Sequence, residues 1–529
     1  MDNGRDGLTL EQAIGQRMLV SFVGYEVPEE FAAMLRHRHT GGVTLFRGQN
    51  VQSPAQVRAL TAALQQSAAE GGQPSILVGA DQEGGTLLAL SGTTRFPGNM
   101  ALGATRSPEL ARRTGVAIGR ELAAMGINVN YAPVCDVQMN PKNPVIGPRS
   151  FGEDPSLVAL LASAMVEGLQ EAGVAATAKH FPGHGDTSTD SHYGTPVLHF
   201  DTERLHRVEL PPFEAAIKAG TKLIMTAHIA LPAITNGVEI PATLSPAILQ
   251  GLLRGEMGFD GVIVSDAMNM GAIKQGQGLV VDTIAAAAAG VDLLMFIDDL
   301  ERLEMLYDVV LQAAQRGLLA EPGVMESAGR VLALKSWLSE QEQPGLEVVN
   351  CAEHNDLAYE IAAQATTLVR NRAGLLPLHV TPNEKVLAIV PQPQDLTPAD
   401  TSSYDLPPLA EALRRHHPYV DEVVVPLNPN ETEIETVRQQ ARNYNVIVVG
   451  TINAADYAGA GKLVKALLET NSNVVAVALR LPYDIAAYPT APTYVCTYGI
   501  QPPSMDALAD ALWGKIPFVG QLPVTVPDL

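Results

Sequence analysis

The sequence predicts an α/β protein built as a (β/α)8 TIM-type barrel followed by an α/β (αβα) sandwich domain. Eight short apolar runs alternate with amphipathic segments between residues 18 and 300. Ionisable residues follow nearly all of these runs, and a second series of apolar runs begins after a polar segment. Alternating strands and helices indicate a parallel sheet covered on both faces, and eight such units fit a barrel. A long open sheet is the competing architecture.

The eight predicted strands are short and almost continuously apolar, as buried parallel strands are. They are MLVSFVG from Met18, GGVTLF from Gly41, SILVGAD from Ser75, INVNYAPV from Ile127, VAATAKH from Val174, KLIMTAH from Lys222, GVIVSDA from Gly261 and VDLLMFI from Val291.

The predicted helices lie between these runs, and several begin with Ser-Pro or Asp-Pro. That pair suits an N-cap residue followed by proline at the first helical position. The clearest examples span 54–70, 108–125, 155–172 and 245–256.

The chain changes character after the barrel pattern ends. We predict a catalytic barrel domain over residues 1–338, a polar linker over 339–350 and a sandwich domain over 351–529. The sandwich is predicted from apolar runs starting at Lys385, Val420, Asn445, Asn473 and Thr493, with helices over 431–441 and 459–468 between them.

Bulk composition excludes several classes of protein. The formal net charge of −22 argues against a nucleic-acid partner or an anionic membrane surface. Three well-separated cysteines without CxxC spacing give no disulfide framework. No apolar signal-peptide core and no run of 18 apolar residues is present, so we expect a soluble cytoplasmic protein, either a monomer or a homodimer.

Ionisable residues follow seven of the eight predicted strands. In a barrel the carboxyl ends of the strands share one rim, where active sites form. The sequence therefore predicts an active site at this rim, with candidates Arg47, Asp81, Asp136, Lys179 with His180, His228, Asp266 and Asp298.

The densest set of titratable residues is the segment KHFPGHGDTSTDSHYGTP, residues 179–196. Its glycines and Pro182 place it on a loop. In the Asp-Ser-His sequence, Asp190 and His192 point to one side if the chain is extended, so the carboxylate could orient the imidazole and raise its basicity. A metal site is the alternative for this loop, although no HxH or HExxH spacing is present.

Two carboxylates end apolar strands elsewhere. Asp266, in VIVSDAM, is either a catalytic carboxylate or a helix N-cap. Asp81, in VGADQEGG, is either an acceptor for substrate hydroxyls or part of an Asx-turn, and Glu83 could take the same role.

The loop 179–196 resembles the signature loop of glycoside hydrolase family 3 β-N-acetylglucosaminidases of the NagZ-like, two-domain form. The segments ADQEGG at 80–85, FPGNMALGAT at 96–105, the stretch 132–155 and VIVSDAMNMGAI at 262–273 are similar to the same family, in family order. In the second domain, TTLVRN, GLLPL, YGIQPPSMDALADALWGK and GQLPV are similar to the sandwich of two-domain members.

The resemblance implies a retaining exo-β-N-acetylglucosaminidase that releases non-reducing terminal N-acetylglucosamine, from peptidoglycan (muropeptide) fragments in nature. Asp266 would form the covalent glycosyl-enzyme, and His192 with Asp190 would be the acid/base dyad. The sugar hydroxyls would be bound by Asp81, Arg149, Lys179 and His180, with His228 and Met295 near the sugar by analogy. No cofactor and no metal are expected.

One departure from the family pattern concerns arginines that commonly follow DQEGG. The corresponding positions here are Ala89 and Thr86, and Arg95 is the nearest arginine downstream. Three alternatives remain open on sequence grounds: a β-N-acetylglucosaminide or β-glucoside phosphorylase, a metal-dependent hydrolase, and a catalytically silent sugar-binding protein.

Overall fold

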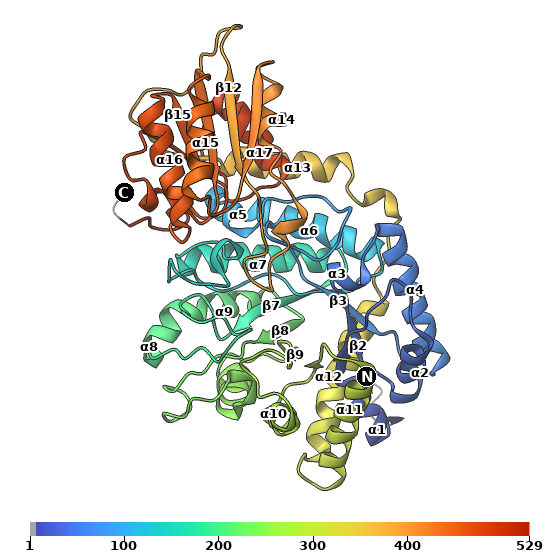
Figure 1. Ribbon diagram of the computed structural model, residues 1–529. Helices are drawn as coiled ribbons and strands as arrows, with labels where there is room; N and C mark the ends of the chain where they lie inside the picture. Colours follow the sequence, from blue (N-terminus) through green and yellow to red (C-terminus); the bar gives the residue numbers. More distant parts are fainter. Residues whose placement is uncertain (1–6, 528–529) are drawn as a thin grey trace.

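The first sheet is a closed barrel of eight parallel strands, as seen in a computed structural model that describes residues 7–527 (Figure 1). The strand order is β10-β1-β2-β3-β6-β7-β8-β9. A parallel bridge between Val264 of β9 and Leu293, next to β10, closes the barrel. The strands are β1 (Met18–Val20), β2 (Gly42–Thr44), β3 (Leu77–Ala80), β6 (Val129–Asn130), β7 (Ala175–Phe181), β8 (Leu223–Thr226), β9 (Val262–Ser265) and β10 (Leu294–Met295).

Helices surround the barrel. Their starts follow the sequence prediction: the side chains of Ser53, Ser107 and Asp154 each accept a backbone N–H of the first helical turn, and proline follows each of them. The helices are α1 (Leu10–Gln16), α2 (Glu29–Arg38), α3 (Arg47–Asn50), α4 (Pro54–Glu70), α5 (Asn99–Thr105), α6 (Pro108–Ala124), α7 (Pro155–Glu171), α8 (Thr202–Arg204), α9 (Pro211–Lys218), α10 (Gln277–Ala289), α11 (Leu300–Gln315) and α12 (Glu321–Ser339). The helix predicted over 245–256 is wound as a π-helix, Ala247–Glu256.

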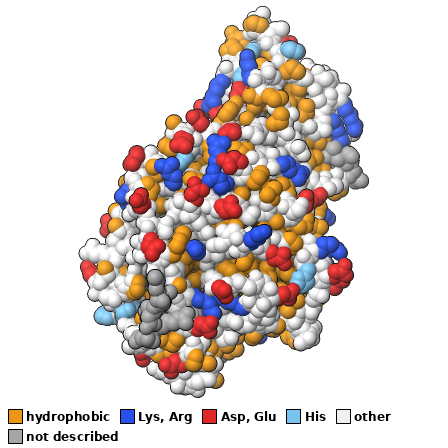
Figure 2. Space-filling model, turned by 180° about the vertical axis from the view of Figure 1, so that it is seen from behind, with side chains coloured by type: hydrophobic (Ala, Val, Ile, Leu, Met, Phe, Trp, Pro, Cys, Tyr) orange, Lys and Arg blue, Asp and Glu red, His pale blue; other side chains and the backbone are white. Residues whose placement is uncertain are grey.

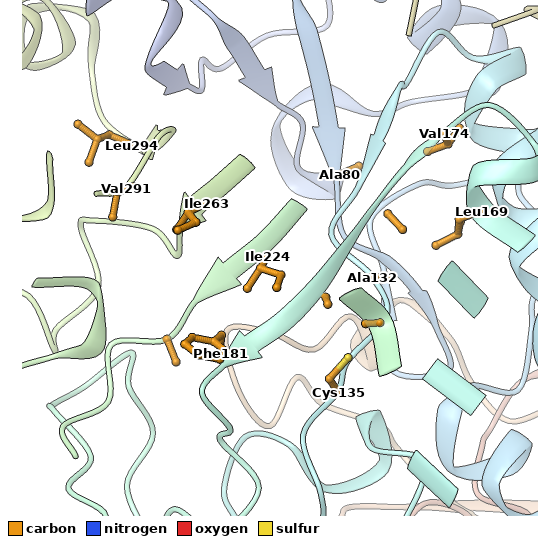
Figure 3. Close-up of a cluster of buried hydrophobic side chains, with 14 of the residues drawn as sticks. Ala80, Ala132, Cys135, Leu169, Val174, Phe181, Ile224, Ile263, Val291 and Leu294 are labelled. Carbon is orange, nitrogen blue, oxygen red and sulfur yellow. The ribbon is translucent and has the colours of Figure 1, made fainter. Parts of the chain in front are cut away.

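The short barrel strands alternate their side chains between two apolar layers. Leu19 and Met225 belong to the cluster inside the barrel, whereas Val20 and Ile224 pack outward against the helices. Figure 3 shows the outer layer, in which Ile224 and Ile263 from the strands lie in the same cluster as Leu169 of α7. Both faces of the sheet are therefore buried, which explains the continuously apolar strand sequences.

The second domain is an αβα sandwich with strand order β11-β16-β15-β14-β12-β13. Its strands are parallel except that β11 runs antiparallel to β16. One face packs on α15 and α16 and the other on α14 and α17. The elements are α13 (Ala352–Ala365), β11 (Thr367–Asn371), β12 (Val386–Pro391), α14 (Leu409–Arg414), β13 (Val420–Val425), α15 (Glu431–Ala441), β14 (Val446–Thr451), α16 (Ala458–Thr470), β15 (Val474–Ala478), β16 (Thr493–Cys496) and α17 (Pro502–Leu512).

The two domains share buried contacts. Glu121 of α6 accepts hydrogen bonds from Thr94, from the backbone of Asn350 and from His354 of α13. Residues 392–408, between β12 and α14, extend from the sandwich over the barrel (Figure 1). We call this segment the bridging loop; it brings the second domain to the rim of the barrel.

On the face of the molecule in Figure 2, acidic and basic side chains are interspersed among apolar ones. Among residues 7–527 there is no helix with the length and apolarity needed to cross a membrane.

The fold class predicted from the sequence is confirmed. Among the strands, the hairpin of β4 (Gln82–Gly84) and β5 (Leu87–Leu88) and the antiparallel edge strand β11 were not predicted. Strands of only two or three residues are too short to give an alternating apolar–polar pattern, so the sequence does not predict the hairpin.

Candidate active site

A cavity of about 510 Å³ lies at the carboxyl ends of the barrel strands, a size typical of small-molecule sites. The barrel contributes most of its wall, and the bridging loop contributes the rest. Of the residues predicted from the sequence, those that line it are Arg47, Asp81, Arg149, Lys179, His180, His192, Asp266 and Met295.

Its inner end is built from two cations and two carboxylates. Lys179 Nζ lies 2.6 Å from both Asp81 Oδ1 and Glu83 Oε1. Arg149 binds Glu83 with two N–H groups, at 2.8 and 2.9 Å. Glu83 is buried beneath the pocket, whereas the Asp81 side chain is 25% exposed and faces it. The structure thus separates two carboxylates that sequence spacing could not.

The charges in this cluster stabilise one another. Burial opposes ionisation of Glu83, but Arg149 and Lys179 outweigh it and lower the pKa of Glu83 to about 2. Burial alone would lower the pKa of Lys179, and the fields of Asp81 and Glu83 raise it instead. The inner end therefore presents a fixed cation and a carboxylate to the hydroxyls of a ligand.

His180 is held by a carboxylate from the segment that follows the neighbouring strand, β6. Its Nδ1 lies 2.7 Å from Asp136 Oδ2, and its Nε2 lies 3.3 Å from Arg149 Nη2. Asp136 is fully buried and also accepts the backbone N–H of His184 at 2.6 Å. Asp136 therefore orients the loop that follows β7 and does not itself line the pocket.

Asp266 is the carboxylate directly after β9. Its Oδ1 accepts the backbone N–H of Ala267 at 2.8 Å, and the residue is only partly buried. Burial opposes ionisation, but His228, His180 and His192 and this hydrogen bond lower the pKa of Asp266 below its ordinary value. Asp266 is thus an ionised carboxylate open to the pocket, as a nucleophile would be.

Asp190 and His192 form the pair expected from their spacing. His192 Nδ1 lies 2.6 Å from Asp190 Oδ1, which also accepts the backbone N–H of His192 at 2.9 Å. Burial opposes ionisation of Asp190, but the hydrogen bonds from His192 lower the pKa of Asp190. With Nδ1 engaged, Nε2 of His192 is the atom available for proton transfer in the pocket.

The loop carrying this pair is fastened at both sides. His184 Nε2 and Ser191 Oγ are 3.0 Å apart, and burial lowers the pKa of His184 to about 4, so this imidazole is neutral. On the other side, the backbone N–H of Gly271 donates to the carbonyl of His192 at 3.0 Å. The loop after the β9 carboxylate therefore also positions His192.

Two predicted residues lie elsewhere. His228 is fully buried outside the pocket lining, where its Nε2 lies 3.1 Å from the carbonyl oxygen of Ala267 and its Nδ1 lies 2.8 Å from Thr243 Oγ1. It supports the turn that holds Asp266. Asp298 pairs with Arg302 at 3.1 Å, away from the pocket lining.

The histidine and aspartate side chains of the loop, which could have bound a metal ion, do not converge on one point. Asp186 pairs with Arg204 at 3.0 Å, and the other candidates are bonded to the partners described above. Across the described part of the chain, no three His, Cys, Asp or Glu side chains are arranged to hold a metal ion.

The bridging loop forms the outer wall of the pocket, with Asp395, Ala399, Thr401 and Tyr404 among the lining residues. Its Thr401 donates its backbone N–H to the Thr86 carbonyl at 2.8 Å, and its Oγ1 accepts the N–H of Leu88 at 3.1 Å. Sequence patterns gave no signal for this contact, because it joins residues more than 300 positions apart.

Arg95, considered from the sequence as a replacement for the arginines at positions 86 and 89, does not line the pocket. It pairs with Asp405 of the bridging loop at 2.7 Å. Arg47, after β2, lines the pocket instead.

Comparison with known proteins agrees with this geometry. The glycosyl hydrolase family 3 N-terminal domain matches residues 9–334, and the C-terminal domain of that family matches residues 366–529. β-Hexosaminidase A of Pseudoalteromonas piscicida is 37% identical over 413 residues, which cover 70% of this chain and 69% of that protein. A β-N-acetylglucosaminidase/β-glucosidase of Cellulomonas fimi is 29% identical over 539 residues, covering 94% of this chain and 90% of that protein.

Among solved structures, a glycoside hydrolase family 3 β-N-acetylglucosaminidase from Paenibacillus sp. FPU-7 is 37% identical, with a TM-score of 0.93. The match covers 98% of this chain and 99% of that one. Both domains, the barrel site and the relatives agree: the chain belongs to glycosyl hydrolase family 3 and is a glycoside hydrolase.

Proposed function

We propose that this glycoside hydrolase is a retaining exo-β-N-acetylglucosaminidase with Asp266 as nucleophile and His192, oriented by Asp190, as acid and base. The observation that carries the proposal is that an ionised Asp266 and His192 line one pocket, and that Asp190, which does not line it, holds the His192 ring from behind. The names of the relatives from Pseudoalteromonas and Paenibacillus support the choice of N-acetylhexosamine as the sugar.

In the first step, an Asp266 oxygen bonds to the anomeric carbon as the glycosidic C–O bond breaks. His192 Nε2–H gives its proton to the departing oxygen. In the second step, His192 Nε2 takes a proton from water, the water oxygen bonds to the anomeric carbon, and Asp266 leaves as a carboxylate. A histidine suits both steps because its side chain titrates near neutral pH.

The shape of the pocket supports release of one terminal sugar. The inner end is closed by the buried cluster of Lys179, Glu83 and Arg149, against which the terminal sugar would rest. The rest of the glycan would then extend toward the open end. Peptidoglycan (muropeptide) fragments, suggested by the family resemblance, are the proposed natural substrate.

The test is hydrolysis of a chromogenic β-N-acetylglucosaminide and the matching β-glucoside, each with and without phosphate. We expect phosphate-independent turnover of the N-acetyl substrate by the native chain and loss of at least about 10³-fold in Asp266→Ala, since the covalent step is removed. Turnover that requires phosphate would instead identify a phosphorylase. Turnover of neither substrate, or undiminished activity of Asp266→Ala, would overturn the proposal.

A further inference from the structure

Arg47 is a cation at the open end of the pocket whose charge is not matched by a neighbour. No carboxylate lies within 4 Å of it in the part of the chain that the structure describes. The two nearby carboxylates of the bridging loop have other partners: Asp405 pairs with Arg95 at 2.7 Å, and Asp395 accepts the N–H and the Oγ–H of Ser403, both at 2.8 Å.

The Arg47 side chain is nevertheless held in place. Its guanidinium carbon lies 4.3 Å from the centre of the Tyr404 ring, and Nη1 donates to the Leu88 carbonyl oxygen at 3.4 Å. A guanidinium has five N–H donors, and only this one has a protein acceptor among the described residues. The others are available to a ligand in the pocket that Arg47 lines.

The second domain supplies this arrangement. Thr401 fastens the bridging loop to Thr86 and Leu88, which brings Tyr404 over Arg47. Ala89, another lining residue, is small and leaves the space in front of this wall open. The cation at this wall is thus Arg47, the first residue of α3, held by Tyr404 of the bridging loop; positions 86 and 89 supply none.

Arg47 lies where the leaving group of a bound substrate would extend. The closed inner end holds Lys179, Glu83 and Arg149, all buried, whereas Arg47 is half-buried and Tyr404 is 55% exposed. A sugar seated against the inner end directs its glycosidic bond and the rest of the substrate toward the open end.

We propose that Arg47, stacked on Tyr404 of the second domain, determines specificity by binding a carboxylate on the leaving group. This inference rests on the proposed function, because the leaving group is defined by cleavage of the terminal sugar. The charge and the fork of N–H donors suit a carboxylate, which can accept two of them.

The test compares two substrates that differ only in charge: N-acetylglucosaminyl-β-1,4-N-acetylmuramic acid and its lactyl methyl ester. We expect kcat/KM of the native chain to favour the acid by about 10- to 100-fold, the range for a charge-assisted hydrogen bond. Arg47→Gln should bring the ratio close to one, because kcat/KM for the acid falls much more than kcat/KM for the ester. Arg47→Lys should restore part of the preference, and Tyr404→Phe should retain more of it than Tyr404→Ala.

Lys142→Gln is the matched control. Lys142 is an exposed cation on the loop that carries Val145 and Ile146 of the pocket wall, but it does not line the pocket. Lys142→Gln should leave the acid-to-ester ratio of kcat/KM unchanged. If the ratio falls equally in Lys142→Gln and in Arg47→Gln, the preference is a long-range charge effect, and the assignment of Arg47 is overturned.

If the native chain hydrolyses the acid and the ester with nearly equal kcat/KM, the inference is overturned, whatever the variants do. Failure of the proposed function is distinguishable, because then neither the ester nor the chromogenic N-acetylglucosaminide is hydrolysed. In that case binding of the acid and the ester to Asp266→Asn, measured by calorimetry, decides the inference: equal affinities contradict it. Turnover of the ester that rises with added phosphate would place phosphate, and not a substrate carboxylate, at Arg47.

Discussion

His192 Nδ1 and Asp190 Oδ1 lie 2.6 Å apart, and the same carboxylate oxygen accepts the backbone N–H of His192. One oxygen therefore fixes both the ring and the chain that carries it. Two further contacts hold this segment: Ser191 is bonded to His184, and the His192 carbonyl accepts the backbone N–H of Gly271. The arrangement suits a proton-transfer group that must keep one orientation in two successive steps.

Replacing Asp190 by Asn should test the carboxylate without removing the hydrogen-bond acceptor. The lost negative charge no longer stabilises the imidazolium, so cleavage of substrates with poor leaving groups should fall by about 10²-fold or more. Aryl glycosides with good leaving groups need little protonation and should lose less in the first step. Pre-steady-state rates for a series of aryl N-acetylglucosaminides measure this, and equal losses across the series would contradict the acid role.

Gly271→Ala should displace His192 while leaving the side chains of Asp190 and His192 chemically unchanged. A Cβ at Gly271 would lie 2.7 Å from the His192 carbonyl oxygen and 2.9 Å from the Tyr193 carbonyl carbon, so the loop must shift. We expect kcat for poor leaving groups to fall by about 10-fold or more, since small misplacements of catalytic groups are costly. The affinity for N-acetylglucosamine should change little. Gly251→Ala is the control, because its Cβ would meet no atom within 4 Å.

Glu83→Gln should weaken both the fold and the sugar site. The change leaves Arg149 and Lys179 buried beside a neutral amide, and breaking such a buried pair costs about 3–5 kcal/mol. Asp81 would be drawn further onto Lys179, so the inhibition constant of N-acetylglucosamine should rise. Melting curves and inhibition by the free sugar measure the two effects.

Glu121→Gln separates these two effects. Glu121 is as buried as Glu83 but binds Thr94 and His354 between the domains. It should lower the melting midpoint and leave sugar inhibition unchanged. If both variants weaken sugar binding equally, Glu83 has no special part in the site.

The barrel could be predicted because its sequence signal is local: each buried strand is a short apolar run, and several helices start with a capping side chain followed by proline. The Asp190–His192 pair was predicted from an extended loop, but the structure forms it in a turn. The backbone N–H of Tyr193 donates to the Asp190 carbonyl at 3.0 Å, and Asp190 Oδ1 accepts the backbone N–H of His192 at 2.9 Å. These inferences depend on neighbours in sequence.

The supporting residues of the site depend on contacts between distant segments, which no local pattern reports. Glu83 is two residues from Asp81, yet only the fold shows that one is buried against Arg149 and the other faces the pocket. His228 ends a strand like the other candidates, but its ring turns to the backbone of Ala267. Arg47 was a candidate at the rim, but its contact with Tyr404 of the other domain joins residues too distant for a local pattern to report.

A buried carboxyl group in the second domain gives a prediction about pH that is independent of catalysis. Asp484 is 1% exposed; it accepts Thr451 Oγ1–H at 2.6 Å and the backbone N–H of Ala454 at 2.7 Å. Burial raises the pKa of Asp484 to about 7, which these hydrogen bonds only partly oppose. In the unfolded chain an aspartate titrates near its ordinary value of about 3.9.

The sign of the effect follows from proton binding. Between about pH 4 and pH 7 the folded chain holds this proton and the unfolded chain does not, so the contribution of Asp484 to stability falls as the pH rises. The loss is at most about 1.4 kcal/mol per pH unit and ends above pH 7, where both states are ionised. Asp484→Asn keeps the shape and removes the titration. We therefore expect the variant to gain melting temperature over the native chain progressively from pH 5 to pH 7, while hydrolysis of the chromogenic substrate stays the same. A constant difference in melting temperature across this range would show that Asp484 is ionised in the folded chain at both pH values.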